Sequence, residues 1–379
     1  MRSLDSAREV CEQFHPGLVK ALDALTFAER ETPGSPVIEL FRDHGGVGLL
    51  VPTEHGGHGA DLVEAVQVMR AIGSLSPSLA AAATMHHFTA ATLYALAPTE
   101  GRLSAAQVEL LKSVVPGRKI LASGWAEGRT EQNILVPAVT AVPVEGGYRL
   151  SGTKKPCSLS KSMDYLTASI AVPGATGEPE LAMALIPADA EGISVHPFWG
   201  NDVLAAAESE EVRLVDVFVP EDLVIRTTAE DPERMVALQL AGFVWFELLI
   251  SAGYVGAASA LVEKVLKRGR GSATDQVQLV IKVESAFAVL EGAARGVLDG
   301  VDGEEAVANA LVARFAAQQA IAESTATALE LLGGLDFITS ADSARLATGV
   351  RPLAFHPPSR NSVAEALVAY YNGADLELG

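Results

Sequence analysis

Three serines stand where a strand would be expected to alternate apolar and polar side chains. Residues 149–172, RLSGTKKPCSLSKSMDYLTASIAV, contain a strand-like segment, a Gly-Thr-Lys turn and a second apolar strand. Ser158, Ser160 and Ser162 lie between the two apolar segments. Such hydroxyls either satisfy the backbone of an ordinary turn or face a ligand. The pattern of residues leaves both interpretations open.

A single carboxylate interrupts the most apolar stretch of the chain. Glu247 lies within FVWFELLISAG, residues 243–253. A buried charge is costly unless it is paired or faces a ligand. Glu247 is therefore a candidate catalytic residue, and the alternative is that it pairs with an arginine elsewhere.

Two adjacent histidines, His86 and His87, lie in a second apolar helical stretch, SLAAAATMHHFTAATLYALA. Imidazole is the side chain whose charge changes near neutral pH, so histidine serves widely in catalysis and ligand binding. We expect these two residues either to line a substrate pocket or to lie on the helix surface.

Composition excludes several classes of protein. The chain has 379 residues, a hydrophobic content of 49% and a net charge of −19, which argues against binding to nucleic acid or to an anionic membrane. Its two cysteines, Cys11 and Cys157, have no metal-binding spacing, so we expect no metal site and a reducing, cytoplasmic location. Apolar runs are broken by charges or glycines short of a membrane span, and residues 1–15 lack a signal-type apolar core.

The chain divides into three parts by pattern. Residues 1–117 show helical apolar periodicity, for example over 61–75 and 78–97. Residues 118–228 contain short alternating segments and glycine turns that are typical of strands. Residues 229–379 return to long helices, over 235–268, 276–301 and 303–334, and Gly333-Gly334 predicts the end of the last.

Five motifs, in order along the chain, resemble the acyl-CoA dehydrogenase superfamily. This resemblance covers roughly residues 35–365. It implies an α+β multidomain fold with an N-terminal helical domain, a central β-domain and a C-terminal four-helix bundle. The motifs are LFRDHGGVGLLVPTEHGGHGAD, ASGWAEGRTEQ, GYRLSGTKKPCSLS, VRLVDVFVPEDLVI and ELLGGLDF.

The resemblance implies a flavin cofactor, either FAD or FMN. Ser158 falls on the family's threonine that hydrogen-bonds flavin N5, and Pro156 falls where dehydrogenases usually carry tryptophan. A hydroxyl suits that place because it can donate or accept. Ser160 and Ser162 are kept as turn residues. The strand that meets the flavin pyrimidine ring in the family contains Trp125, Ala126 and Glu127.

The family also holds the adenosine end of FAD from a neighbouring subunit. Glu330, Gly333 and Gly334 match its Gln-x-x-Gly-Gly segment. The family's Arg-x-x-Phe-Gly motif is absent, and KRGRGSATDQVQ stands in its place. Further candidate cofactor contacts in that stretch are Arg268, Arg270 and Gln278. Sharing of this kind predicts a homodimer or homotetramer.

Neither position of the family's catalytic carboxylate is filled. His356 in LAFHPPSRNS stands at one position, Phe246 stands at the other, and Glu247 follows one residue later. We expect the α,β-dehydrogenation of an acyl thioester, on coenzyme A or a carrier protein, with Glu247 or His356 as the base. The electrons would pass through the flavin to an acceptor, in specialised metabolism.

Two alternatives remain. Flavin monooxygenases share the resemblance, use reduced flavin from a reductase together with oxygen, and often place histidine and serine around the isoalloxazine ring. His86, His87, Ser158 and His356 would suit that reaction. In the third interpretation the chain is a degenerate, non-catalytic member without flavin.

Overall fold

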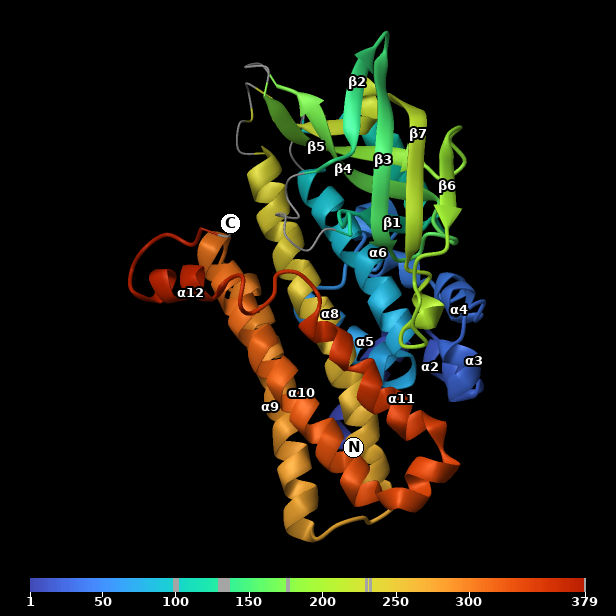
Figure 1. Ribbon diagram of the computed structural model, residues 1–379, viewed down its shortest axis with the longest axis vertical. Coiled ribbons are helices and arrows are strands. Elements are labelled where there is room, and N and C mark those ends of the chain that lie inside the picture. Colours follow the sequence, from blue (N-terminus) through green and yellow to red (C-terminus); the bar gives the residue numbers. More distant parts are fainter. Residues whose placement is uncertain (98–101, 129–136, 175–177, 229–230, 232–233, 378–379) are drawn as a thin grey trace.

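A β-sheet stands at one end of a set of long helices in a computed structural model of the chain (Figure 1). The structure describes residues 1–97, 102–128, 137–174, 178–228, 231 and 234–377. Helices come first, strands second and helices last, so the predicted order of the three parts is confirmed. The predicted domain boundaries, after residues 117 and 228, stay predictions, because helix Pro77–Leu96 (α6) of the first part packs on helix Arg234–Lys267 (α8) of the third.

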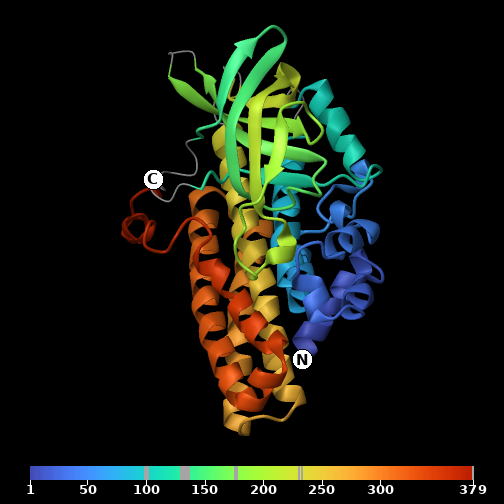
Figure 2. The same ribbon diagram turned by 45° about the vertical axis from the view of Figure 1, so that its right-hand side comes forward.

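The N-terminal helices pack on one side of the long helices (Figure 2). Two of them, Leu62–Leu75 (α5) and Pro77–Leu96 (α6), pack on the long helix Arg234–Lys267 (α8), and both begin with a side-chain cap. Asp61 and Glu64 form a capping box at the start of α5, and Ser76 caps α6. The helices are α1 (Arg2–Phe14), α2 (Leu18–Asp23), α3 (Phe27–Glu31), α4 (Val37–Asp43), α5 (Leu62–Leu75), α6 (Pro77–Leu96) and α7 (Ala105–Val114).

The described strands form one mixed sheet. Its order is β6-β7-β3-β2-β4-β5-β8, and β1 pairs in parallel with β4. The Gly-Thr-Lys turn predicted within residues 149–172 is wrong, because β3 runs through it and pairs with β7 across two register irregularities. The strands are β1 (Leu121–Gly124), β2 (Thr140–Val144), β3 (Gly147–Cys157), β4 (Tyr165–Pro173), β5 (Pro179–Pro187), β6 (Ile193–His196), β7 (Glu210–Pro220) and β8 (Val224–Arg226).

The C-terminal helices form a bundle in which α8 (Arg234–Lys267), α9 (Ala273–Leu298) and α10 (Gly303–Thr339) run up and down beside one another, and α11 (Ala341–Gly349) packs on α8 and α10. A short 3₁₀ turn, η5 (Arg351–Ala354), and α12 (Ala364–Tyr371) follow. The predicted stop at Gly333-Gly334 corresponds to a break in the helical backbone. Gly333, at φ 83° and ψ 169°, breaks the helix, which then resumes to Thr339.

Helix α8 is the core of the bundle. Among the described residues it is the one helix that could cross a membrane by length and composition, contrary to the expectation that apolar runs fall short. However, 59% of its most apolar stretch is buried inside the protein, as in the core helix of a folded domain.

Glycines let α8 approach the backbone of α5 and a small side chain of α6. A Cβ added at Gly73 of α5 would lie 1.9 Å from the carbonyl oxygen of Gly253 on α8. A Cβ at Gly256 would lie 2.1 Å from the carbonyl oxygen of Arg70, and one at Gly253 would lie 2.9 Å from Cβ of Ala80 on α6. A crossing this close excludes every side chain larger than hydrogen.

We therefore expect Gly73→Ala to destabilise the protein by about 3 kcal/mol, because overpacking outweighs the gain in helix propensity of about 1 kcal/mol. Urea unfolding followed by circular dichroism measures the change. Gly292→Ala is the matched control, since Gly292 lies inside α9 and an added Cβ meets no atom within 4 Å. The control should be stabilised slightly. A Gly73→Ala variant that behaves like the control would contradict the close crossing.

Candidate active site

His356 lies on a loop that packs against α8. We call residues Val350–Arg360 the strap. The Nε2 atom of His356 is 2.9 Å from the Tyr254 hydroxyl, and its ring meets Phe246 edge-on with centroids 5.7 Å apart. Phe246 in turn meets Phe88 of α6, with centroids 5.6 Å apart. The structure therefore brings together two of the predicted site residues, His356 and Phe246, beside an aromatic wall.

Glu247 forms a buried ion pair on the neighbouring face of α8. Its carboxylate oxygens accept hydrogen bonds of 2.8 and 2.9 Å from Arg314 of α10, and both side chains are fully buried. Burial raises the pKa of Glu247 to about 7, and the charge of Arg314 opposes that shift. Glu247 thus has the arginine partner that was expected as the alternative to a catalytic role. With its carboxylate so occupied, Glu247 is poorly suited to take a proton from a substrate.

His356 is neutral at physiological pH. Burial lowers its pKa to about 3, and the charge of Arg314 adds to that effect. A neutral imidazole has one donor and one acceptor nitrogen. The strap therefore presents a hydrogen-bonding group rather than a cation.

Ser158 lies at the end of β3, half-buried and 2.9 Å from the hydroxyl of Ser209, which precedes β7. Its neighbour Ser160 donates to the carbonyl of Glu208 and so satisfies backbone, as a turn residue does. The hydroxyl pair can reverse its donor and acceptor roles, which keeps Ser158 available as a contact for a group that changes protonation.

The Trp125–Glu127 segment follows β1 and contacts β3. The carbonyl of Ala126 accepts a 2.8 Å hydrogen bond from the Lys155 amide. Glu127 pairs at 2.6 Å with the fully buried Lys154 and accepts from the Ala138 amide. Glu127 is thus committed to internal bonds. Residues 129–132 of the quoted motif lie outside the described residues.

His86 and His87 point into the N-terminal helices. Both are fully buried, so the surface alternative is wrong. His86 is bonded at both nitrogens, to the Val47 carbonyl at 2.9 Å and the Leu121 amide at 3.1 Å. His87 packs on Phe41 with centroids 5.5 Å apart, and neither of its nitrogens has a partner in the described structure. The described contacts do not join either histidine to His356.

The predicted adenosine contacts lie at the opposite end of the bundle from the sheet (Figure 1). Arg268, just beyond α8, pairs with Asp336, and Gly333 lies at the break in α10. Twenty residues of helix separate Glu247 from the end of α8, which is about 30 Å. In one chain these residues cannot reach a ring held beside His356. Every predicted adenosine contact is exposed or half-buried in one chain. These residues are Arg268, Arg270, Gln278, Glu330, Gly333 and Gly334.

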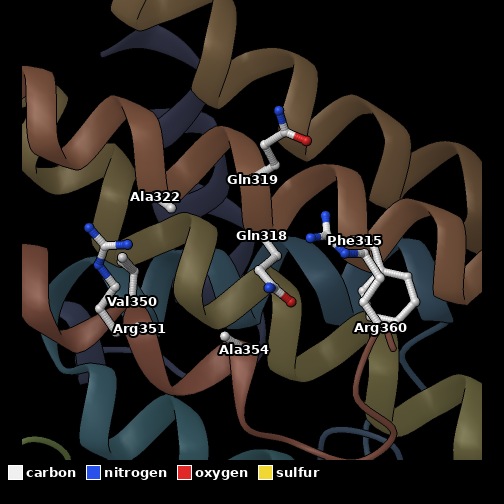
Figure 3. A pocket seen from close by; sticks show the side chains of 8 residues that line it. All are labelled: Phe315, Gln318, Gln319, Ala322, Val350, Arg351, Ala354 and Arg360. Atoms are coloured by element: carbon white, nitrogen blue, oxygen red, sulfur yellow. The ribbon is translucent and has the colours of Figure 1, made fainter. Parts of the chain in front are cut away.

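A pocket of about 390 Å³ opens on the other side of the strap (Figure 3). It separates part of the strap from α10, so that the strap is packed on its α8 side and open on this one. The residues that line it are Phe315, Gln318, Gln319, Ala322, Val350, Arg351, Ala354 and Arg360.

Sequence reasoning missed Tyr254, Arg314 and Phe88. Tyr254 is seven residues, or two helical turns, after Glu247 and so shares its face of α8. Arg314 is a lone charge in the apolar run ALVARFAAQQA, the same signal that pointed to Glu247. Phe88 directly follows the two histidines that drew attention instead.

This chain is similar to a known protein family, to curated relatives and to solved structures. The acyl-CoA dehydrogenase N-terminal domain family matches residues 3–102. Isobutylamine N-hydroxylase of Streptomyces viridifaciens is 58% identical over 378 residues, which cover 100% of both chains. A dibenzothiophene monooxygenase of Rhodococcus qingshengii is 28% identical over 53% of this chain and 48% of its own. The solved structure of KijD3 with FMN and a dTDP-linked amino sugar superposes with a TM-score of 0.83 at 22% identity, over 98% of this chain and 95% of that one.

The expected dehydrogenation of an acyl thioester is wrong, and the acyl carrier predicted with it loses its basis. The full-length relative is an amine N-hydroxylase and the partial one a monooxygenase. The physical reason is visible at the two base positions, where His356 and Phe246 replace a carboxylate, while the adjacent carboxylate of Glu247 is bound to Arg314. The chain belongs to the acyl-CoA dehydrogenase superfamily of flavin-dependent oxidoreductases, among those members that resemble monooxygenases rather than thioester dehydrogenases.

Proposed function

We propose that this protein is a reduced-flavin-dependent monooxygenase that hydroxylates the nitrogen of a small aliphatic primary amine. The observation that carries the proposal is the 58% identity with isobutylamine N-hydroxylase over the whole chain. The neutral His356 and the aromatic wall of Phe88 and Phe246 support it.

The residues present suit a flavin, reduced FAD or FMN. The reversible hydroxyl pair of Ser158 and Ser209 can serve a ring nitrogen in either redox state. The flavin, when bound, supplies two electrons to oxygen. KijD3 was solved with FMN, which supports this class of cofactor. A flavin reductase is the partner that we propose as the source of the electrons.

The site also suits an amine that must react with its lone pair free. An alkylammonium ion has a pKa of about 10 in water, so most of the substrate arrives protonated. Burial against Phe88 and Phe246 disfavours the charged form, whereas a free carboxylate would favour it. Arg314 occupies the carboxylate of Glu247 and so removes that competing effect.

The overall reaction consumes one amine, one dioxygen and one reduced flavin with its two hydrogens. One oxygen atom forms the N–O bond of the hydroxylamine, the other leaves as water, and the flavin is released oxidised. Protein mixed with reduced FMN or FAD, isobutylamine and ¹⁸O₂ is expected to yield one labelled hydroxylamine per flavin oxidised, by mass spectrometry. Quantitative hydrogen peroxide with every amine of three to six carbons would contradict the proposal.

We further propose that the Arg268 end of one subunit's bundle contacts the flavin of a neighbour. Arg268→Gln and His356→Ala variants, each inactive alone at limiting flavin, should then complement when co-expressed. Random dimers would contain about a quarter of intact sites, because one mixed site keeps both residues. Hydroxylamine yield of the mixture is the measurement. A yield no greater than the sum of the two variants would place Arg268 outside the shared site.

A further inference from the structure

Arg314 contacts more than its counter-ion. Its second terminal nitrogen donates to the carbonyl of Leu353 at 3.1 Å and to the carbonyl of His356. Leu353 lies in η5, which is one turn of 3₁₀ helix. The last carbonyl groups of such a short helix have no hydrogen-bond donor within the helix itself. The rigid fork of a guanidinium can join a carboxylate on one helix to two carbonyls on a loop, which a lysine cannot do. The Cζ atom of Arg314 lies 5.3 Å from the centroid of the Phe315 ring, a cation–π contact.

Val350 and Leu353 bury their side chains in the core, whereas the rest of the strap is exposed or half-buried. Beside His356, Phe355 is 83% exposed, and the pocket of Figure 3 lies beneath Arg351, Ala354 and Arg360. The backbone of His356 is anchored by Arg314 and its ring by Tyr254, both from the bundle. These two anchors define where the imidazole stands.

The ion pair is a poor device for stability alone. Desolvation of two charges consumes most of what their attraction gains, and apolar side chains of similar volume often replace such pairs without loss. A fully buried pair that also bonds the strap points to a role in positioning.

We propose that Arg314, oriented by Glu247, is a positioning residue that holds the strap and its His356 against α8. The role in turnover rests on the proposed monooxygenase function. The contact itself does not, so the two can fail separately.

The test uses Glu247→Met/Arg314→Met, which removes both charges without stranding either. The matched control is Arg70→Met/Glu284→Met, a pair with a 2.7 Å contact and an arginine 1% exposed, which bonds α5 to α9 and does not touch the strap. Arg314→Lys keeps the charge and loses the fork. Each variant is first compared with the wild type by thermal unfolding.

Two readouts need no turnover. Trypsin cleavage after Arg360 should become at least tenfold faster in the Glu247→Met/Arg314→Met variant, and the NMR signal of the His356 ring should move or broaden. In the control, both should match the wild type. A strap that is cleaved at the wild-type rate with an unchanged His356 signal would overturn the proposal.

The third readout is the yield of hydroxylamine per flavin. Displacement of a catalytic group by about 1 Å costs up to 10²-fold, so we expect the yield to fall by between tenfold and 10²-fold, with Arg314→Lys also impaired. The control should keep its yield even if its melting temperature changes. Equal yields in both double variants would overturn the positioning role. A wild type without any hydroxylamine, but with a protected strap, would reject the proposed function alone.

Discussion

His356→Ala is expected to convert the enzyme into one that makes hydrogen peroxide from reduced flavin and oxygen while the yield of hydroxylated amine falls about 10²-fold. The neutral imidazole, fixed by Tyr254 and Phe246, offers a placed donor or acceptor that alanine lacks. Without it the two electrons of the flavin still reach oxygen, and the oxygen is not passed to the amine.

A peroxidase-coupled assay and hydroxylamine detection by mass spectrometry measure the two products together. His356→Gln should recover part of the yield, because its amide can hydrogen-bond. His196→Ala, on the edge strand β6, is the matched control and should be coupled like the wild type. If His356→Ala kept the wild-type ratio of product to peroxide, His356 would have no part in the reaction.

Acid is expected to unfold the protein through four histidines. Burial lowers the pKa of His15 and His86 to about 4, of His356 to about 3, and of His87 well below 6.5. In the unfolded chain each returns to about 6.5, so below that pH the unfolded state binds up to four more protons. Stability is complete above pH 6.5 and is lost as the pH falls from 6.5 towards 4.

Two buried carboxyls act in the opposite direction. Burial raises the pKa of Glu31 and of Glu247 to about 7, so these groups bind protons in the folded state and gain stability between about pH 7 and 4.5. The histidines outnumber them. The net loss between pH 6.5 and 5 is about 3 kcal/mol, a large part of the usual stability of a domain.

Urea midpoints measured from pH 7.5 to 5 test this expectation. In His87→Gln the ring that has no partner is replaced by a side chain that does not titrate, so the pH slope should fall by about 1.4 kcal/mol per unit. His196→Gln is the control and should keep the wild-type slope. A stability that stays level down to pH 5 would show that these histidines are hydrated or paired in solution.

The fold could be predicted to the level of its parts. Apolar periodicity located α5, α6 and the long helices, because each of them buries one face or all faces. Local signals failed where tertiary pairing decided the outcome. Gly152–Lys154 has the composition of a turn, yet β7 pairs with it and keeps it in β3. The glycine signal at Gly333 was informative, because the helical backbone is broken at that residue.

The sequence could indicate individual residues of the site, but not the residues that they contact. Glu247 was recognisable as a charge in an apolar helix, but only the three-dimensional structure joins it to Arg314, 67 residues away. His356 was found by resemblance, while the only signal for Tyr254 is its position two helical turns after Glu247. His86 and His87 show the opposite failure. Their type suggested a pocket, and packing places them among the N-terminal helices.

The glycine contacts of α8 also bear on how this scaffold could be re-engineered. Gly73, Gly253 and Gly256 set the spacing of α5 and α8 through backbone, and Gly253 leaves room for the Cβ atom of Ala80 on α6. Neighbouring positions can therefore change in size without shifting the helices. A mutant library for bulkier amines should vary Phe88 and Phe246 together, since their rings touch, and keep the three glycines constant. Diversity would then be concentrated in the aromatic wall that we propose to face the amine and withheld where it would only unfold the protein.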